Sequence, residues 1–308
     1  MTIEHHLMDT IKLIADSGST KTDWCLLESG GDCHRFSTQG INPCHQSEEE
    51  IAAILEQEVT PHLRQLQTAR PQTLWFYGSG ATPAAKQRVE QPLRRLLGTE
   101  ADITVESDLV GAARALCQHS RGIACILGTG ANSCLYDGLR IVANTPALGY
   151  ILGDEGSGAV LGIRFLNALF KGQLPDELRQ EFVTETGLSL DAIIQRVYRE
   201  PLANRFLASL SPFIHRHLHL QQVEALVIDH FRQFIRKNIQ PYYDDPRLKE
   251  ALPISPELHV TGSVGFHYQR QLAAAAALEG MRLGRVMGSP MEGLIGYHSS
   301  QSSPSTSL

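Results

Sequence analysis

One local pattern occurs twice in this sequence and limits what it can fold into: an apolar strand, a tight turn of small polar residues, and a second apolar strand. The first copy begins at Lys12 and ends at Leu27, with the polar string of residues 16–22 between its strands. The second copy begins at Ile123 and ends at Tyr136, around a Gly-Thr-Gly turn. Short apolar runs joined by such turns predict β-hairpins. Their repetition indicates two related lobes that face each other.

Helices and strands alternate after each hairpin. Ser47 and Glu50 have the spacing of a capping box, which predicts the start of a helix. Strands are predicted at residues 74–77, 103–105 and 258–261. Helical periodicity marks three further stretches, which are the residues leading to Leu96, the run from Val223 to Ile235, and an alanine-rich run from Leu272. Such alternation is typical of α/β layers.

The length of the chain, 308 residues, is sufficient for two lobes that each bury a core. We expect an α/β fold with mixed sheets flanked by helices and a cleft between the lobes. The predicted N-terminal lobe is residues 10–120 and the predicted C-terminal lobe is residues 121–298. The serine-rich residues 299–308 are expected to form a disordered tail.

The composition is that of a soluble globular protein, with 42% hydrophobic and 19% charged residues. The formal net charge of −6 argues against nucleic acid as a partner. No apolar run is long enough to span a membrane, and the first residues lack the features of a secretory signal. Six dispersed cysteines without a CxxC pair are expected to be reduced thiols, so we expect a cytoplasmic protein without a membrane partner.

The first turn, residues 16–22, combines small residues, hydroxyl groups and a carboxylate. Backbone N–H groups and hydroxyls in such a turn can bind a phosphate, and Asp16 can hold a metal ion or its water shell. The turn does not match the P-loop pattern, because Thr20 stands where a glycine must precede Lys21. A polar hairpin without a ligand is the alternative interpretation.

The second turn, residues 128–133, also offers accessible backbone groups and the Thr129 hydroxyl. Taken alone, it fits a glycine-rich β-turn equally well. Because each turn directly follows an apolar strand, two opposed turns from two lobes could hold the phosphates of a nucleotide between them.

Asp108 follows the predicted strand at residues 103–105 and opens a predicted helix at residues 109–117. The carboxyl end of a strand is where α/β folds place catalytic groups, and an aspartate at a helix start is also a common N-cap. One residue can serve both purposes.

Two further glycine-rich stretches are candidates for ligand contact. Residues 153–158 place two adjacent acids between glycines, which suits carboxylate recognition of sugar hydroxyls; a capped helix start is the alternative. Gly262 and Ser263 follow a strand and fit close backbone approach to a flat ligand such as adenine, or a plain strand-to-helix turn.

The histidines do not predict a metal site. His215, His217 and His219 alternate along the chain, but no carboxylate stands at a fixed spacing from them. A solvated helical turn is the favoured interpretation. His230 lies on an apolar helical stripe and is expected to be a hydrogen-bonded packing residue.

Taken in order, these segments resemble the superfamily of acetate and sugar kinases, Hsp70 and actin. Within it, the chain is similar to the BadF/BadG/BcrA/BcrD ATPase group, and most similar to N-acetylglucosamine kinases. The resemblance covers residues 11–297 and is carried by six motifs in the expected order: I-A-D-S-G-S-T-K-T-D, G-I-N-P, E-S-D-L-V-G-A-A-R-A, I-L-G-T-G-A-N-S, G-Y-I-L-G-D-E-G-S-G and V-T-G-S-V. It implies two actin-like, ribonuclease H-like lobes.

The resemblance also implies a role for each matching position. Asp16 would organise Mg²⁺, and Asp108 would be the catalytic aspartate that accepts the proton of the sugar hydroxyl. The positions implied to contact ATP are Gly18, Ser19, Thr20, Lys21, Thr129, Gly262 and Ser263. The positions implied to contact the sugar are Asn42, Asp108, Ala131, Asn132, Ala147, Leu148, Gly149 and Asp154.

The implied activity is an ATP- and Mg²⁺-dependent amino-sugar kinase that phosphorylates the 6-hydroxyl of N-acetyl-D-glucosamine. Leu148 departs from the tryptophan that animal N-acetylglucosamine kinases carry, so N-acetylmuramic acid and glucosamine remain alternative acceptors. Ser17 replaces a glycine common in the first motif, which requires a negative φ at this position. The alanine-rich C-terminal helix could support a homodimer.

Two other functions are considered. Some members of the BadF/BadG group are ATPases that activate a partner enzyme by electron transfer, which needs cysteines that hold an iron–sulfur cluster. Cys125 and Cys134 lie in or beside the second turn and match that arrangement poorly. The other alternative is a non-enzymatic sugar sensor that keeps the fold. Related sugar-responsive repressors carry a DNA-binding helix-turn-helix ahead of the lobes, for which we expect no room before Lys12.

Overall fold

The structure is a computed structural model in which residues 11–18, 20–28, 32–65 and 71–299 are described. The chain divides into two compact units. The first comprises the described residues of Met1–Ala115 and Pro290–Leu308, and the second comprises Leu116–Ser289. This division differs from two continuous lobes, because the chain returns to the first unit at Pro290.

The return is explained by helix α15 (Met291–Ser299), which packs on the first unit. Met291 and Leu294 are buried in one apolar cluster with Ile14 and Cys25, which belong to the first two strands of the chain. The sequence of α15 contains no separate signal for this partner. The boundary therefore depends on packing between segments that are far apart in the sequence.

The first unit is built on a five-stranded mixed sheet of order β3-β2-β1-β4-β5. Neighbours among β3, β2 and β1 are antiparallel, whereas β1, β4 and β5 run parallel. The strands are β1 (Lys12–Ser17), β2 (Lys21–Leu27), β3 (Cys33–Gln39), β4 (Thr73–Gly78) and β5 (Asp102–Ser107). The other helices that carry residues of this unit are α1 (Glu48–Ile54), α2 (Thr60–Gln65), α3 (Gln87–Leu97) and α4 (Asp108–Cys117).

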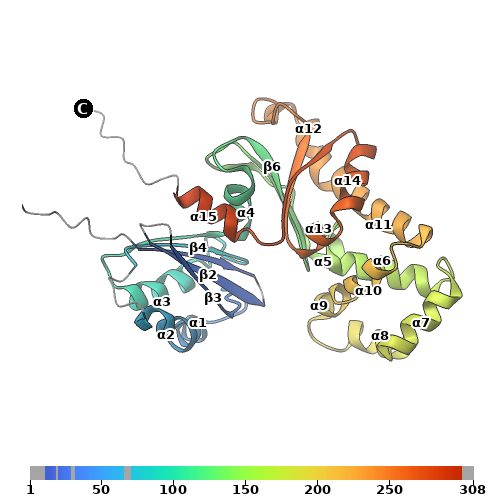
Figure 1. Cartoon of the computed structure of the whole chain (residues 1–308), viewed down its shortest axis with the longest axis horizontal. Coiled ribbons are helices and arrows are strands. Elements are labelled where there is room, and N and C mark those ends of the chain that lie inside the picture. The colour runs from blue at the N-terminus through green and yellow to red at the C-terminus, as the bar shows by residue number, and fades with distance from the viewer. Residues whose placement is uncertain (1–10, 19, 29–31, 66–70, 300–308) are drawn as a thin grey trace, which may run out of the picture. The chain divides into compact units, whose positions relative to one another are not determined.

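Helices cover both faces of this sheet, because successive strand residues point to opposite sides. Leu13 packs in a cluster with Ile51 and Leu93, which come from α1 and α3. Its neighbour Ile14 packs on the other side with Leu294 of α15. Figure 1 shows α1, α2 and α3 below this sheet and α15 above it.

The second unit contains a five-stranded mixed sheet of order β10-β9-β6-β7-β8. The strands are β6 (Gly122–Leu127), β7 (Ala131–Tyr136), β8 (Ile141–Ala143), β9 (Glu257–Thr261) and β10 (Arg282–Met287). The α-helices are α5 (Gly149–Leu152), α6 (Gly158–Phe170), α7 (Asp176–Thr186), α8 (Leu190–Tyr198), α9 (Ala203–Ala208), α10 (Ser211–Arg216), α11 (Gln221–Phe234), α12 (Gln240–Asp244), α13 (Ser263–His267) and α14 (Gln269–Leu278). A 3₁₀ turn, Pro246–Leu248, follows α12.

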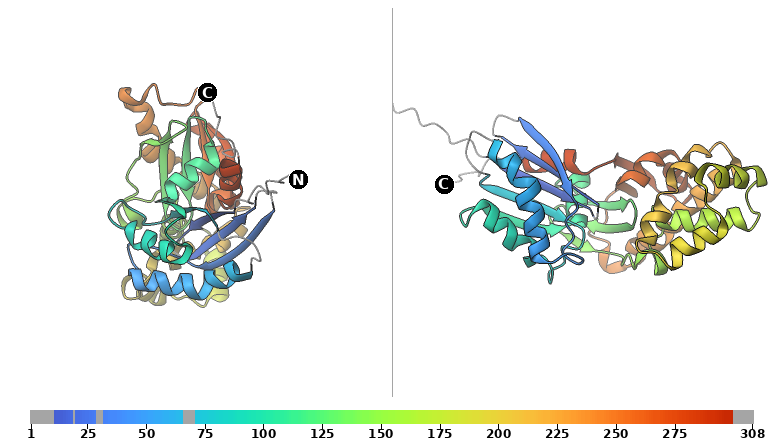
Figure 2. Two further views of the ribbon diagram at one scale, coloured as in Figure 1. Left: turned by 90° about the vertical axis from the view of Figure 1, so that its left-hand side faces the viewer. Right: turned by 90° about the horizontal axis from the view of Figure 1, so that it is seen from below.

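One apolar core joins this second sheet to its helices. Ile123 and Leu258 of the sheet lie in the same cluster as Phe165 of α6, Phe231 of α11 and Leu272 of α14. Helices α6 to α11 are green-yellow to orange in Figure 2. The long helical segment between β8 and β9 therefore belongs to the core of the second unit.

The two units share one plan, as the repeated hairpin predicts. In each sheet the first strand of the hairpin, β1 or β6, is the central strand. Two later strands, β4 and β5 or β9 and β10, continue the sheet parallel to it on the side away from the hairpin. The orders β3-β2-β1-β4-β5 and β8-β7-β6-β9-β10 therefore correspond strand by strand. Each unit also has a π-helical turn, Leu55–Val59 and Ile235–Ile239, shortly before Pro61 and Pro241. Proline lacks an N–H donor and clashes with the carbonyl four residues earlier, which a wider turn relieves.

Local predictions are confirmed at several elements. Ser47 and Glu50 form the predicted capping box at the start of α1. His230 is buried and its Nε2 lies 3.1 Å from the carbonyl oxygen of Ser157. His217, by contrast, is buried and contacts Phe213 and Glu181, so the prediction of a solvated turn is wrong at this residue. Ser17 lies in the extended backbone of β1, as its replacement of glycine requires.

Among the described residues, none of the helices has the length and apolar character that a membrane crossing requires.

The close approach of α6 and α9 gives a test of the second core. A side chain at Gly162 would overlap the carbonyl oxygen of Leu207, because the two helix backbones meet there. We expect Gly162→Ala to lower the free energy of unfolding by about 1–3 kcal/mol, since an extra methyl group must push the helices apart. Urea denaturation measures this change.

Asn167→Ala is the matched control, because Asn167 lies on the exposed side of the same helix. Its effect should stay within about 0.5 kcal/mol. Equal stability of Gly162→Ala and the wild type would contradict the close approach.

Candidate active site

Two carboxylates of the first unit lie where its parallel strands end. Asp16 is near the end of β1, and Asp108 begins α4 directly after β5. In the parallel register, Asp16 pairs with Tyr77 of β4, and Gly78 pairs with Ser107 of β5. Parallel strands bring their carboxyl ends to one edge, so the two acids meet there.

The electrostatics of Asp16 show how close this association is. The pKa of Asp16 is raised to about 7, mainly by burial and additionally by the negative charges of Asp108 and Asp23, while Lys21 opposes the shift. Asp23 is the residue directly opposite Asp16 in the β1–β2 pair. Lys21 binds Asp23 at 2.9 Å and so does not neutralise Asp16 by a direct ion pair.

Asp108 has a similar environment with more hydrogen bonds. Burial raises its pKa, although its carboxylate accepts hydrogen bonds from the Leu109 N–H at 2.9 Å and from the Ser79 side chain. Two carboxylates held together in a desolvated edge form the donor set that Mg²⁺ prefers. The residues present therefore fit a magnesium ion held by Asp16. Among the residues that the structure describes, no group of three or more His, Cys, Asp or Glu side chains forms a metal cluster.

The first turn and the Asn42 loop border the same edge. The Gly18 N–H donates to the Lys21 carbonyl at 3.0 Å, and the Gly40 N–H donates to the Thr20 carbonyl at 3.1 Å. Ser19 lies outside the described residues. The buried hydroxyl of Ser17 lies 2.6 Å from that of Thr22 and bonds to the backbone of Ile41, which ties the turn to the segment that precedes Asn42.

Asn42 is buried beside the loop that holds Ser79. Its Oδ1 accepts a hydrogen bond from the Cys44 N–H at 3.0 Å, and a Cβ at Gly80 would overlap that oxygen. Gly80 has φ +77°, which a glycine adopts without strain. The predicted sugar contact Asn42 and the predicted base Asp108 are therefore both held against residues 78–80.

In the second unit, the Gly-Thr-Gly turn is fixed to the start of α6. Gly158 N–H donates to the Gly128 carbonyl at 2.8 Å, and Ala159 N–H donates to the Thr129 carbonyl at 3.2 Å. These bonds satisfy donors at the first turn of the helix that would otherwise lack partners. The position of Thr129 is consequently set by α6 as well as by its own hairpin.

The Asp154 carboxylate closes the loop around α5. The backbone N–H of Asp154 donates to the Ala147 carbonyl at 2.9 Å, and the Asp154 carboxylate accepts from the Gly149 N–H. Asp154 and Leu148 both have left-handed backbones, with φ of 53° and 62°. A Cβ at Gly130 would lie 3.2 Å from Asp154 Oδ2, so this carboxylate adjoins the Gly-Thr-Gly turn.

Leu148 is 64% exposed at the start of α5. Left-handed backbone is uncommon for a leucine and is maintained here by the closed loop.

The remaining predicted contacts of the second unit fall into two places. Gly262 has φ +108°, and a Cβ added there would overlap the Leu127 carbonyl. Gly262 therefore lies against the end of β6, and Ser263 follows it as the first residue of α13. Ala131 and Asn132 begin β7, where Asn132 Oδ1 accepts from the Ser133 N–H and from Asn144 Nδ2, each at 2.9 Å.

The structure thus groups the predicted residues within each unit. The sequence reasoning missed Ser79, Asp23 and Asn144, which bind or face predicted site residues. Ser79 stands in a Gly-Ser-Gly run directly after a predicted strand, and this signal could have identified it. Asp23 and Asn144 depend on strand register and carry no such local signal.

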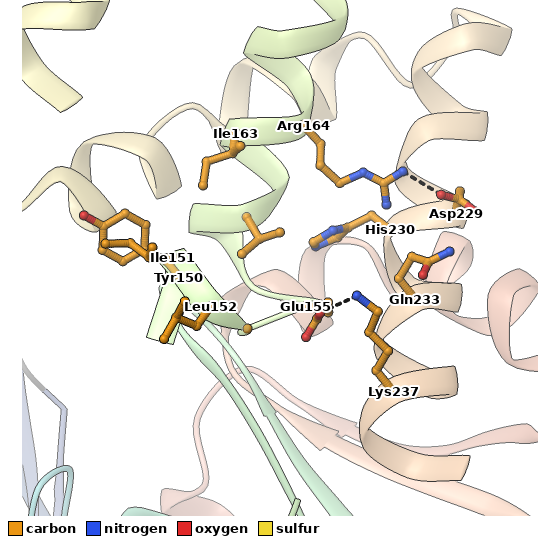
Figure 3. A pocket seen from close by; sticks show the side chains of 12 residues that line it. Tyr150, Ile151, Leu152, Glu155, Ile163, Arg164, Asp229, His230, Gln233 and Lys237 are labelled. Atoms are coloured by element: carbon orange, nitrogen blue, oxygen red, sulfur yellow. Dashed lines mark hydrogen bonds and ion pairs between the residues drawn. The ribbon is translucent and has the colours of Figure 1, made fainter. Parts of the chain in front are cut away.

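A separate pocket of about 560 Å³ lies in the second unit, beside α6 and α11 (Figure 3). Its polar wall contains two ion pairs, Arg164 with Asp229 at 2.5 Å and Lys237 with Glu155 at 2.7 Å. Gly153 and Glu155, from the glycine-rich stretch predicted to recognise sugar hydroxyls, line the pocket, whereas none of the positions implied to contact ATP or the sugar does. Because each of these cations is already paired with an acid of the same pocket, no unbalanced charge marks it for a charged ligand.

The chain is similar to a crystal structure named "putative N-acetylglucosamine kinase" from Porphyromonas gingivalis. The two sequences are 47% identical, the match covers 94% of this chain and 99% of that chain, and the TM-score is 0.85. A protein of the same name from Chromobacterium violaceum is 18% identical over 94% of this chain and 98% of its own, with a TM-score of 0.67. Glucokinase from Balamuthia mandrillaris, in complex with glucose, is 11% identical over 97% of this chain and 95% of its own, with a TM-score of 0.58.

The last two similarities are in fold alone, and they agree with the predicted actin-like architecture. No protein-family model matches the chain, and no curated protein matches it. Membership of the BadF/BadG group therefore stays a prediction.

The burial of Asp154 gives a pH-dependent test. Burial raises its pKa from 3.8 to about 6, although the Gly149 N–H opposes this shift. The folded protein therefore holds this proton more tightly than the unfolded chain, and stability falls as the pH rises through this interval. Asp154→Asn removes the charge and keeps a side chain that tolerates left-handed backbone. Its melting temperature should equal that of the wild type near about pH 4 and exceed it near about pH 8.

Asp191→Asn serves as the control, because Asp191 is exposed on α8. It should show no gain that grows with pH. Loss of stability of Asp154→Asn at the higher pH would mean that the charged carboxylate stabilises the loop.

Proposed function

The chain belongs to the family of actin-like sugar kinases that includes the Porphyromonas gingivalis protein, and we propose that it transfers a phosphoryl group from ATP to the 6-hydroxyl of N-acetyl-D-glucosamine. The observation that carries this proposal is the desolvated pair Asp16 and Asp108 at the carboxyl edge of the first sheet. The name of the 47% identical neighbour supports the choice of sugar.

Asp108 would act as the general base. A sugar hydroxyl is a poor nucleophile, so a carboxylate must orient it and accept its proton as the new bond to phosphorus forms. Burial raises the pKa of Asp108 and makes its carboxylate a stronger proton acceptor. Its hydrogen bonds from Leu109 and Ser79 fix the direction in which the carboxylate points.

Asp16 would hold Mg²⁺ in the complex with ATP. When bound, the ion would neutralise negative charge on the phosphates of the nucleotide. A buried carboxylate beside a second acid gains most from a cation, because the cation offsets both the lost hydration and the repulsion that raise its pKa. Lys21 is kept beside the same edge by Asp23 and would contribute a positive charge to the phosphates.

The other predicted residues would contact the two substrates. Ser19, Thr20 and Thr129 would bind the phosphates through backbone N–H groups and hydroxyls, and Gly18 would let the phosphates approach the same turn closely. Gly262 and Ser263 would contact the adenosine. The sugar would be contacted by Asn42, Ala131, Asn132, Ala147, Leu148, Gly149 and Asp154. We propose that the protein acts in the cytoplasm and that it can assemble as a homodimer.

The acceptor is tested by ADP release with Mg-ATP against a panel. The panel holds N-acetylglucosamine, N-acetylmannosamine, N-acetylmuramic acid, glucosamine, glucose and no sugar. Faster turnover with N-acetylglucosamine than with the other sugars supports the proposal. Preference for N-acetylmuramic acid or glucosamine would change the proposed acceptor but would still support an amino-sugar kinase. ADP release independent of any sugar, with iron absorbance in anaerobically purified protein, would favour an activator ATPase.

Asp108→Asn tests the base. The amide cannot accept the proton, so kcat should fall by at least about 10²-fold while the affinity for sugar stays within a few-fold. A coupled assay and calorimetric titration of the sugar measure the two effects. Near-normal kcat would show that another group is the base.

Asp102→Asn is the matched control, because Asp102 is an exposed aspartate at the start of β5, the strand that Asp108 directly follows. Its kcat should equal that of the wild type.

A further inference from the structure

Two cysteines of the first unit lie together on neighbouring strands. Cys25 of β2 is buried and Cys33 of β3 is exposed, and their Sγ atoms are 2.8 Å apart. The register pairs Cys25 with Arg35 and Leu27 with Cys33, so the two cysteines lie two positions apart on one face of the sheet. Both are thiols in this structure.

The surroundings give the two sulfur atoms different chemistry. Arg35 Nε donates to Cys33 Sγ at 3.2 Å, and Glu292 binds the same guanidinium and holds it in place. Cys33 is exposed, so it is the sulfur atom that a dissolved oxidant reaches first. Burial, together with the hydrogen bond to Cys33, raises the pKa of Cys25 to about 12, so Cys25 keeps its proton and can donate its S–H to Cys33.

The other cysteines lack this combination. Cys117, Cys125 and Cys134 are buried, and burial raises the pKa of each thiol. Cys44 is exposed, but its Sγ donates to the Gly80 carbonyl at 3.3 Å rather than to a second thiol. An exposed sulfur beside a guanidinium and next to a second thiol is typical of a cysteine that is oxidised and then resolved.

We propose that Cys25 and Cys33 form a redox-active dithiol whose oxidant is a hydroperoxide and whose product is a disulfide between β2 and β3. In the first step, the Cys33 thiolate attacks one peroxide oxygen, an S–O bond forms, the O–O bond breaks, and the leaving hydroxide takes up a proton as water. In the second step, Cys25 Sγ attacks the sulfenic sulfur, the S–S bond forms, the S–O bond breaks, and the leaving hydroxide takes the Cys25 proton. With hydrogen peroxide, the dithiol loses two electrons and two water molecules are formed.

This site is distinct from the candidate active site. The first turn and Lys21 are at the beginning of β2, whereas Cys25 lies toward its end and Cys33 begins β3. The proposal concerns the thiols alone, so it does not depend on the identity of the sugar or on the kinase activity.

The sequence allows a direct mass measurement on the full chain. Trypsin cleaves after Lys21 and Arg35, so residues 22–35 form one peptide that contains both cysteines. After treatment with hydrogen peroxide and alkylation of free thiols, this peptide should carry no alkyl group. Its mass should be lower than that of the reduced, unalkylated peptide by two hydrogen atoms. Cleavage after Glu28 should then leave two fragments that separate only after reduction with dithiothreitol.

Three variants distinguish the roles of the thiols. Cys25→Ser should stop at a Cys33 sulfenic acid, which dimedone traps, and Cys33→Ser should leave Cys25 unmodified at the same peroxide concentration. Cys44→Ser is the control, because it removes another exposed cysteine and should still form the disulfide. Cys33→Ser changes an exposed position, so the test remains valid if Cys25→Ser folds poorly.

In the wild type, two of the six thiols should be lost together and recovered together on reduction. A fully alkylated 22–35 peptide after peroxide treatment, or oxidation of Cys44 ahead of Cys33, would overturn the proposal. So would a disulfide from Cys33 to any cysteine other than Cys25.

Discussion

The candidate site depends on the burial of two carboxylates that the first sheet brings to one edge. Asp16 and Asp108 are far apart in the sequence, and only the parallel pairing of β1, β4 and β5 makes them neighbours. Burial raises the pKa of each by disfavouring the charged carboxylate, and the charge of Asp108 adds to the shift of Asp16. Burying two carboxylates is unfavourable unless a cation binds one of them and the other takes up a proton. Phosphoryl transfer supplies both, because it uses a metal ion and releases the proton of the acceptor hydroxyl.

The second unit also contains an unfavourable feature at its predicted site, which is backbone strain in the loop around α5. Leu148 and Asp154 both adopt left-handed backbone, and a glycine would be less strained at either position. Two hydrogen bonds through Asp154, to Ala147 and from Gly149, compensate by closing the loop on itself. The loop thereby keeps a carboxylate beside the Gly-Thr-Gly turn, where a flexible glycine loop would leave it without a fixed position.

Local signals predicted the elements that carry the site, and long-range packing determined the rest. The hairpins, the capping box at Ser47 and the start of α4 at Asp108 follow from spacing and turn chemistry, which act over a few residues. Strand β3 gave no such signal, because only Phe36 and Thr38 of its residues are buried and its apolar alternation is weak. The return of α15 and the hydrogen bond from Ser79 to Asp108 depend on contacts across the fold, so no local pattern encodes them.

The two ends of β2 illustrate why register matters more than composition in this protein. Near its beginning, Asp23 lies opposite Asp16 and holds Lys21, and this pairing adds charge to the candidate active site. Toward its end, the pairing with β3 places Cys25 against Cys33, although the spacing of the six cysteines along the chain suggests independent thiols. A shift of β3 by one residue would turn Cys33 to the other face of the sheet and separate the sulfur atoms. The β1–β2 ladder therefore fixes the acid cluster and the β2–β3 ladder fixes the dithiol, and neither arrangement can be obtained from residue types alone.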